Sequence, residues 1–175
     1  MYLVLAGNLR QSLPLPGRAG TSGVSPNEAI LYPYAEMVTS KGAVLRDLTQ
    51  SQKPVMPLQN GSFNAKGFVS RLDLAYSLVQ SLALEPQAVA KAGTELTANF
   101  NGTTVPVEDA SSVPSEMRGY VQLALDTGML VPRFVLKDST VFGGTPTVVA
   151  YFDATRNISR AEYAYSRSEE HTSEL

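Results

Sequence analysis

Apolar side chains recur three or four residues apart along one stretch of the chain, at Leu72, Ala75, Val79 and Leu82. This spacing places them on one face of an amphipathic helix. Ser70 stands where an N-cap is expected, and Pro86 is expected to end the helix because its ring excludes a further helical turn.

Two further stretches carry a helical pattern, residues 28–41 and 115–127. The inner face of the later one is formed by Tyr120, Val121, Ala124 and Leu125. Gly42 and Gly128 follow the two stretches directly, where a left-handed C-terminal cap favours glycine. Each of these two helices is therefore expected to end at its glycine.

The segments between the helices are rich in β-prone residues. Residues 134–136 and 147–152 flank a turn-rich stretch and predict a hairpin. Residues 96–107 contain Asn101-Gly102, a dipeptide typical of a two-residue hairpin turn. Residues 16–27 are rich in Pro, Gly and Ser, which indicates a linker or a long surface loop.

These elements belong to an internal repeat. Residues 63–77 recur as residues 152–166 with seven identical positions and unchanged spacing. The helix at 34–42 parallels 120–128, and residues 3–15 match 72–84 as a partial third copy. A repeat of this kind indicates a modular array, and such arrays more often bind a partner than catalyse.

The first turn of the repeated helix carries a capping-box pattern in both copies. Ser70 is followed by Asp73, and Ser159 by Glu162. In this pattern each side chain accepts a hydrogen bond from an otherwise unpaired N–H at the helix start. All four residues are therefore interpreted as structural caps, and the two serines are not interpreted as nucleophiles.

A helix, a glycine, an extended loop and then Phe-x5-[Val/Ile]-Ser-Arg-x-[Asp/Glu]-x-Ala opening a second helix resembles the S-layer homology (SLH) module. The resemblance implies a mainly α fold with short β-hairpins (α+β), built as tandem helix–loop/hairpin–helix modules. It also implies a non-catalytic region that anchors an exported protein on cell-wall polysaccharide. The chain departs from the family in having no Trp beside Tyr34 or Tyr120 and in having longer loops between helices.

The repeat divides the chain into six expected parts. Residues 1–15 are the last helix of a preceding SLH-like module, and residues 16–27 are a linker. Residues 28–84 are a module, and residues 85–106 are a linker with a possible hairpin. Residues 107–166 are a shortened module, and residues 167–175 are a tail. The tail loses every apolar position of the helical stripe and resembles the translation of a sequencing-library adapter. It is therefore expected to be an artefact.

Composition narrows the chemistry. The chain has no cysteine, and its one histidine, His171, lies in the tail. Thiolate metal sites and Ser-His or Cys-His catalytic sets therefore have no residues to use, so no catalytic residue, metal or cofactor is assigned. The formal net charge of −2 gives no basic surface for nucleic acid, and no transmembrane stretch stands out. Glu108-Asp109 is too weak a carboxylate pair to indicate calcium.

Four residues are candidates for ligand binding, and each keeps a structural alternative. Arg71 and Arg160 lie in the first helical turn, where a guanidinium can bind the carboxylate or phosphate of an anionic cell-wall polysaccharide or peptidoglycan. The alternative is a salt bridge between modules. Tyr34 and Tyr120 can stack on a sugar ring or pack between helices.

A second resemblance concerns the parent protein. Residues 2–14 and 118–125 are similar to C-terminal extensions of secreted bacterial subtilisin-type (S8) serine peptidases. The resemblance implies an extracellular or cell-surface location and a structural extension that docks on an upstream domain, which would carry the proteolysis. The cell-wall anchor and the structural extension both remain open at this point, and an independent enzyme is the least favoured alternative.

Overall fold

The computed structural model describes residues 38–39, 53–56, 68–139 and 144–158. The chain divides into two compact units, one of residues 1–68 and 77–85 and the other of residues 69–76 and 86–175. Most of the second unit is described, so its elements carry the account below. Of the predicted helix at 28–41, only Val38 and Thr39 are described, and both are helical.

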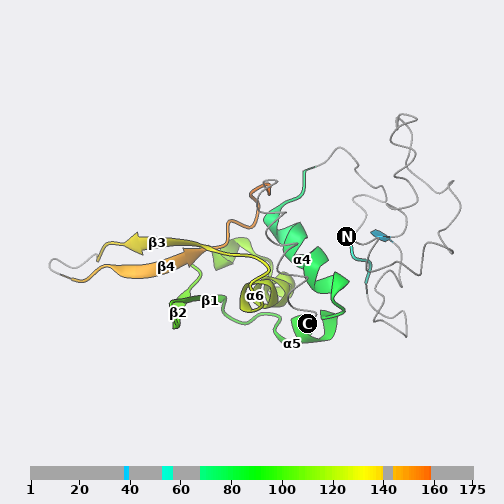
Figure 1. The fold of residues 1–175 in the computed structure, drawn as a ribbon, viewed down its shortest axis with the longest axis horizontal. Coiled ribbons are helices and arrows are strands. Elements are labelled where there is room, and N and C mark those ends of the chain that lie inside the picture. Colours follow the sequence, from blue (N-terminus) through cyan, green and yellow to red (C-terminus); the bar gives the residue numbers. More distant parts are fainter. Residues whose placement is uncertain (1–37, 40–52, 57–67, 140–143, 159–175) are drawn as a thin grey trace, which may run out of the picture. The chain divides into compact units, whose positions relative to one another are not determined.

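The expectation of a mainly α fold is wrong. The described residues contain three α-helices: α4 (Arg71–Ser81), α5 (Glu85–Ala90) and α6 (Arg118–Asp126). They also contain four strands of comparable total length: β1 (Thr97–Phe100), β2 (Thr103–Pro106), β3 (Arg133–Lys137) and β4 (Thr147–Tyr151). The β-rich segments between the helices form paired strands, and so the fold is α+β with neither class dominant (Figure 1).

Helix α4 ends earlier than its sequence predicts. The Ala83 backbone takes a left-handed conformation with φ 58°, and Leu84 N–H bonds the Val79 carbonyl at 3.1 Å. This 6→1 hydrogen bond closes the helix as a Schellman cap, although the left-handed residue is not a glycine. Pro86 lies in the first turn of α5, where its missing N–H is unpaired anyway. The prediction that Pro86 ends α4 was therefore wrong.

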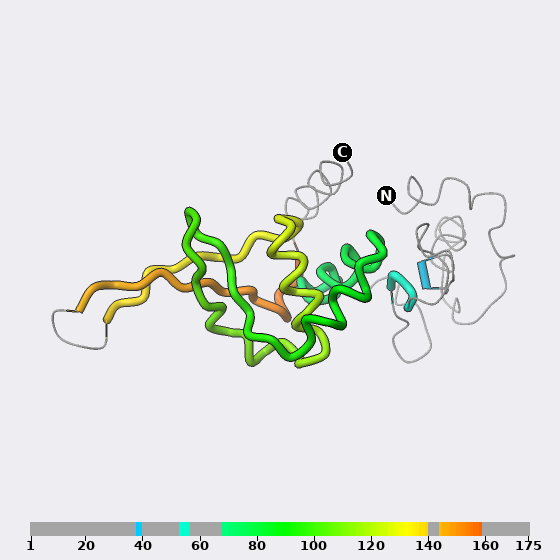
Figure 2. The backbone as a smooth tube through the Cα atoms, turned by 90° about the horizontal axis from the view of Figure 1, so that it is seen from below, coloured from blue at the N-terminus to red at the C-terminus, as the bar shows by residue number. Residues whose placement is uncertain are grey.

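Both predicted hairpins form. Strands β1 and β2 pair antiparallel around Asn101 (φ 49°) and Gly102 (φ 83°), which supply the two positive φ angles that a tight two-residue turn requires. Strands β3 and β4 pair antiparallel from Arg133↔Tyr151 to Lys137↔Thr147. A parallel bridge between Val107 and Ala150 joins the two hairpins, whose bases lie side by side in both views (Figure 2).

Helix α6 packs closely against α5 through Gly119. A Cβ atom on Gly119 would lie 1.8 Å from the Ala88 carbonyl oxygen, so no larger residue fits without moving the backbone. The close approach therefore leaves no room for a side chain at the position before Tyr120. Gly128 follows α6 with φ 74°, as the C-cap prediction requires.

The core of the second unit lies between α6, the hairpin bases and the segment after β4. Its largest fully buried side chains are Val113, Val121, Met129 and Phe152. Tyr120, Val121 and Ala124 of the predicted inner face are buried, whereas Leu125 is only half-buried and Gln122 is buried beside them. No helix of the described residues has the length and apolar character needed to span a bilayer.

Candidate functional site

The structure describes half of the residues that the sequence singles out. Ser70, Arg71, Asp73 and Tyr120 belong to the described residues. The other candidates lie outside them: Tyr34, Ser159, Arg160 and Glu162. The repeat signature can therefore be assessed in its first complete copy.

Ser70 and Asp73 exchange hydrogen bonds at the start of α4. The Asp73 N–H donates to Ser70 Oγ at 3.1 Å, and the Ser70 N–H donates to Asp73 Oδ2 at 3.3 Å. The Ser70 hydroxyl also donates to Asp73 Oδ2 at 2.7 Å. This is the reciprocal geometry of a capping box, and it places Asp73 in the helix terminus rather than in a binding surface.

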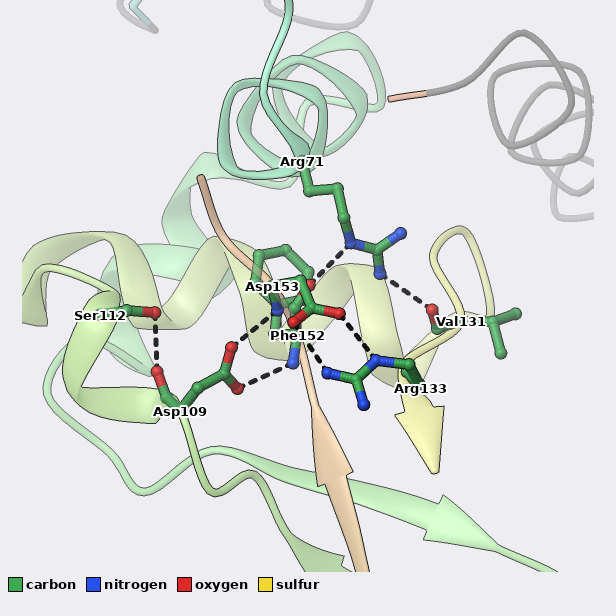
Figure 3. Close-up of polar contacts among 7 residues, drawn as sticks. All are labelled: Arg71, Asp109, Ser112, Val131, Arg133, Phe152 and Asp153. Atoms are coloured by element: carbon green, nitrogen blue, oxygen red, sulfur yellow. Dashed lines mark hydrogen bonds and ion pairs between the residues drawn. The ribbon is translucent and has the colours of Figure 1, made fainter. Parts of the chain in front are cut away.

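Arg71 is buried, with 2% of its surface exposed. Its Nε donates to the Phe152 carbonyl at 2.7 Å, and its Nη2 donates to the Val131 carbonyl at 2.8 Å (Figure 3). The guanidinium carbon also lies 5.1 Å from the centre of the Phe152 ring, within cation–π range. In these contacts the Arg71 guanidinium binds main-chain carbonyls and an aromatic ring of its own chain.

Tyr120 is 2% exposed and packs on Tyr76 of α4, with ring centres 5.0 Å apart and planes tilted by 44°. A tilted aromatic pair of this kind stabilises the contact between two helices. The ring is not available to a sugar in this conformation.

Arg71 belongs to a junction between the two copies of the repeat. The N–H groups of Arg71 and Leu72 donate to the carbonyls of Arg156 and Ala154, and Ile158 N–H donates to the Val69 carbonyl. Val69 and Ile158 occupy equivalent positions of the repeat. We call residues 69–72 and 154–158 the repeat junction, in which a segment of one copy pairs antiparallel with a segment of the other.

The turn at Phe152–Asp153 leads into this junction, and Asp109 fixes it from the other side. The Phe152 N–H donates to Asp109 Oδ1 at 2.8 Å, and the Asp153 N–H donates to Asp109 Oδ2 at 2.7 Å (Figure 3). Asp153 itself is left-handed, with φ 55°. The equivalent position of the other copy is Asn64, and Asn and Asp are the non-glycine residues that best tolerate this conformation.

One ion pair lies at the turn, and a second lies further along the β3–β4 hairpin. Arg133 donates from Nε and Nη2 to the Asp153 carboxylate at 3.2 and 3.1 Å, and Lys137 donates to Glu108 at 2.8 Å. The hydrogen bond from Arg133 lowers the pKa of Asp153 below its ordinary value, and the Glu108 carboxylate raises the pKa of Lys137. Arg133 and Lys137 are thus each paired with a carboxylate of the same chain.

Sequence reasoning missed two residues that organise this unit. Asp109 was set aside with Glu108 as a weak carboxylate pair, yet the two carboxylates bond different partners. Gln122, buried in α6, accepts from the Thr97 N–H at 2.9 Å and donates to the Thr97 carbonyl at 3.1 Å. The polar Gln122 on an otherwise apolar face was the available signal. The described residues contain no cluster of three His, Cys, Asp or Glu side chains that could hold a metal ion.

Comparisons with protein-family models, with curated proteins and with solved structures give no match for this chain.

Proposed function

We propose that this chain is a non-catalytic structural region of an exported bacterial protein, built from SLH-like modules that hold one another in place. The observation that carries the proposal is the position of Arg71. Arg71, the most recognisable residue of the repeat signature, is 2% exposed. Two of its N–H groups donate hydrogen bonds to carbonyls of its own chain. A role in joining the two copies is enough to explain why the signature is repeated in the sequence, without an external ligand.

The second resemblance provides the class of parent protein. A secreted subtilisin-type serine peptidase would carry its catalytic residues in an upstream domain, and the modules would assist its folding, secretion or docking. The chain itself offers no histidine outside residues 167–175 and no cysteine, which agrees with a non-catalytic role.

The test is the substitution Arg71→Ala in the full chain. It leaves the carbonyls of Phe152 and Val131 without their buried donors and opens a cavity, so we expect the free energy of unfolding to fall by about 3 kcal/mol. Urea unfolding followed by circular dichroism measures this loss. Arg133→Ala is the matched control, because Arg133 is 56% exposed and its ion pair is screened by solvent.

The same two variants are then assayed for retention on isolated bacterial cell-wall sacculi, per mole of folded protein. We expect Arg71→Ala and Arg133→Ala to be retained as the unsubstituted chain is. The structural role would be overturned if Arg71→Ala unfolded at the same urea concentration as the unsubstituted chain but was no longer retained on sacculi. Arg71 would then be a ligand-binding residue.

Polymer anchoring remains a second candidate function because of Phe68. Phe68 is 81% exposed and lies three residues before Arg71, the first residue of α4. An exposed aromatic ring can stack on a sugar. Under this candidate, Phe68→Ala lowers retention on sacculi with no change in the free energy of unfolding. Equal retention of Phe68→Ala and the unsubstituted chain would remove this support.

A further inference from the structure

Two successive main-chain N–H groups converge on one carboxylate at the turn after β4. Each oxygen of Asp109 accepts one hydrogen bond, Oδ1 from Phe152 at 2.8 Å and Oδ2 from Asp153 at 2.7 Å. Asp153, the second donor, has a left-handed backbone with φ 55°. Consecutive N–H groups in this geometry form a recurrent anion-binding feature of proteins.

We infer that the Phe152–Asp153 main chain is a carboxylate-binding site and that Asp109 is its built-in ligand. The two donors match the two oxygens of a planar carboxylate, one bond to each, and hydrogen bonds to an ionised acceptor are stronger than those between neutral groups. Two guanidinium groups lie on the other sides of the same turn, Arg71 on the Phe152 carbonyl and Arg133 on the Asp153 side chain (Figure 3). Both favour an anion at this place.

The donors and their ligand come from separate parts of the chain. Asp109 is 43 residues from Phe152 in sequence. Its backbone is held independently of its carboxylate, because the Asp109 carbonyl accepts from Ser112 N–H at 2.9 Å and from Ser112 Oγ at 2.7 Å. We therefore expect removal of the carboxylate to leave the Asp109 loop in place.

The ligand class follows from this geometry. A small monocarboxylate such as formate has the two oxygens and the charge of the Asp109 side chain, and its heavy atoms are the ones that Asp109→Ala removes. In the unsubstituted chain the tethered Asp109 has a high effective concentration, so free formate does not displace it.

The experiment measures thermal unfolding of the full chain carrying Asp109→Ala, in sodium formate and in sodium chloride at equal ionic strength. In chloride we expect the midpoint to fall by about 4 °C or more, because two N–H groups lose their acceptor. Formate at about 100 mM is expected to restore part of that loss in a saturable manner, as mass action requires of a ligand that binds the folded state.

Two matched variants separate site occupancy from general salt effects. Asp109→Asn keeps a carbonyl oxygen in the site and fills its volume, and Ser112→Ala changes only the loop contact. Neither is expected to gain from formate, nor is the unsubstituted chain. A midpoint of Asp109→Ala equal to that of the unsubstituted chain, or an equal formate shift in all four proteins, would refute the site.

If Asp109→Ala does not fold in chloride, the readout becomes the yield of folded protein after dilution from urea into formate or chloride. Recovery in formate alone supports the carboxylate site. Equal failure in both salts contradicts it, since the N–H pair would then not bind the free ligand.

Discussion

Asn101 and Asp153 both place a non-glycine residue in the left-handed region, with φ 49° and 55°, but they reach it by different means. Asn101 is followed by Gly102 in a tight hairpin turn, and the Gly102 N–H bonds Asn99 Oδ1 at 2.8 Å, three residues away. Asp153 has no glycine beside it and is held by Asp109 and Arg133, which are 44 and 20 residues away.

The difference teaches where each turn is encoded. The first turn depends on the four consecutive residues 99–102, so the Asn101-Gly102 dipeptide was enough to predict it. The second turn depends on the side chains of Asp109 and Arg133, which lie near it only in the folded unit. Its local sequence alone therefore does not predict it. The variants below test this contrast, from the largest expected effect to the smallest.

Gln122→Ala tests whether the β1–β2 hairpin is as local as its turn. The side chain of Gln122 is 7% exposed and supplies both a donor and an acceptor to the backbone of Thr97, the first residue of β1. We expect a loss of about 1–3 kcal/mol in the free energy of unfolding, because both buried backbone groups lose their partner. Urea unfolding measures it.

Gln122→Glu is the companion variant, since it keeps the acceptor for Thr97 N–H and loses the donor. Gln122 Nε2 donates to Asp126 Oδ1 at 2.6 Å, so Gln122→Glu would place a second negative charge beside Asp126. We expect the loss in free energy of unfolding to come from this repulsion and from the lost donor. A Gln122→Ala protein as stable as the unsubstituted chain would mean that the hairpin needs no support from α6.

Gly102→Ala tests the local turn itself. No atom lies within 4 Å of a Cβ built on Gly102, so the cost comes only from the positive φ of 83°. We expect about 1 kcal/mol, the usual cost of a left-handed alanine. Gly93→Ala, at φ 75° and equally open, is the control outside the hairpin and should cost a similar amount. A loss several times larger at Gly102 alone would show that the turn supports more than its own backbone.

Acid titration tests the ion pair at the tertiary turn. Because Arg133 lowers the pKa of Asp153 in the folded chain, the unfolded chain binds the proton more readily. The contribution of Asp153 is therefore fully present above the unfolded pKa of about 3.9 and is lost as the pH falls through the lower, folded pKa. We expect a small effect, since the Arg133 side chain is 56% exposed.

Asp153→Asn isolates this effect, because Asn also tolerates the left-handed backbone. The difference in free energy of unfolding between the unsubstituted chain and Asp153→Asn should shrink below about pH 4. A difference that stays constant from pH 6 to acid would remove Asp153 as the titrating group.

The chain by itself determined the elements whose signals are local. The Ser70–Asp73 cap, the Asn101-Gly102 turn, the β3–β4 pairing and the glycine after α6 each depend on residues close together in sequence. Periodicity also placed α6 to within a few residues, since a buried face must recur at helical spacing. The relative content of helix and strand was not predicted, because the helical periodicity led us to expect more residues in helices than in the two hairpins.

Only the tertiary structure decided what Arg71 of the repeat signature does. In sequence, Arg71 in the first turn of a helix has the same local pattern whether it meets a ligand or a carbonyl. Its burial under the Phe152 turn, and the pairing of Val69 with Ile158, require segments more than 80 residues apart to meet. The role of Asp109 is equally non-local. Hydrogen-bond partners at that separation are chosen by packing, which leaves no periodic trace in the sequence.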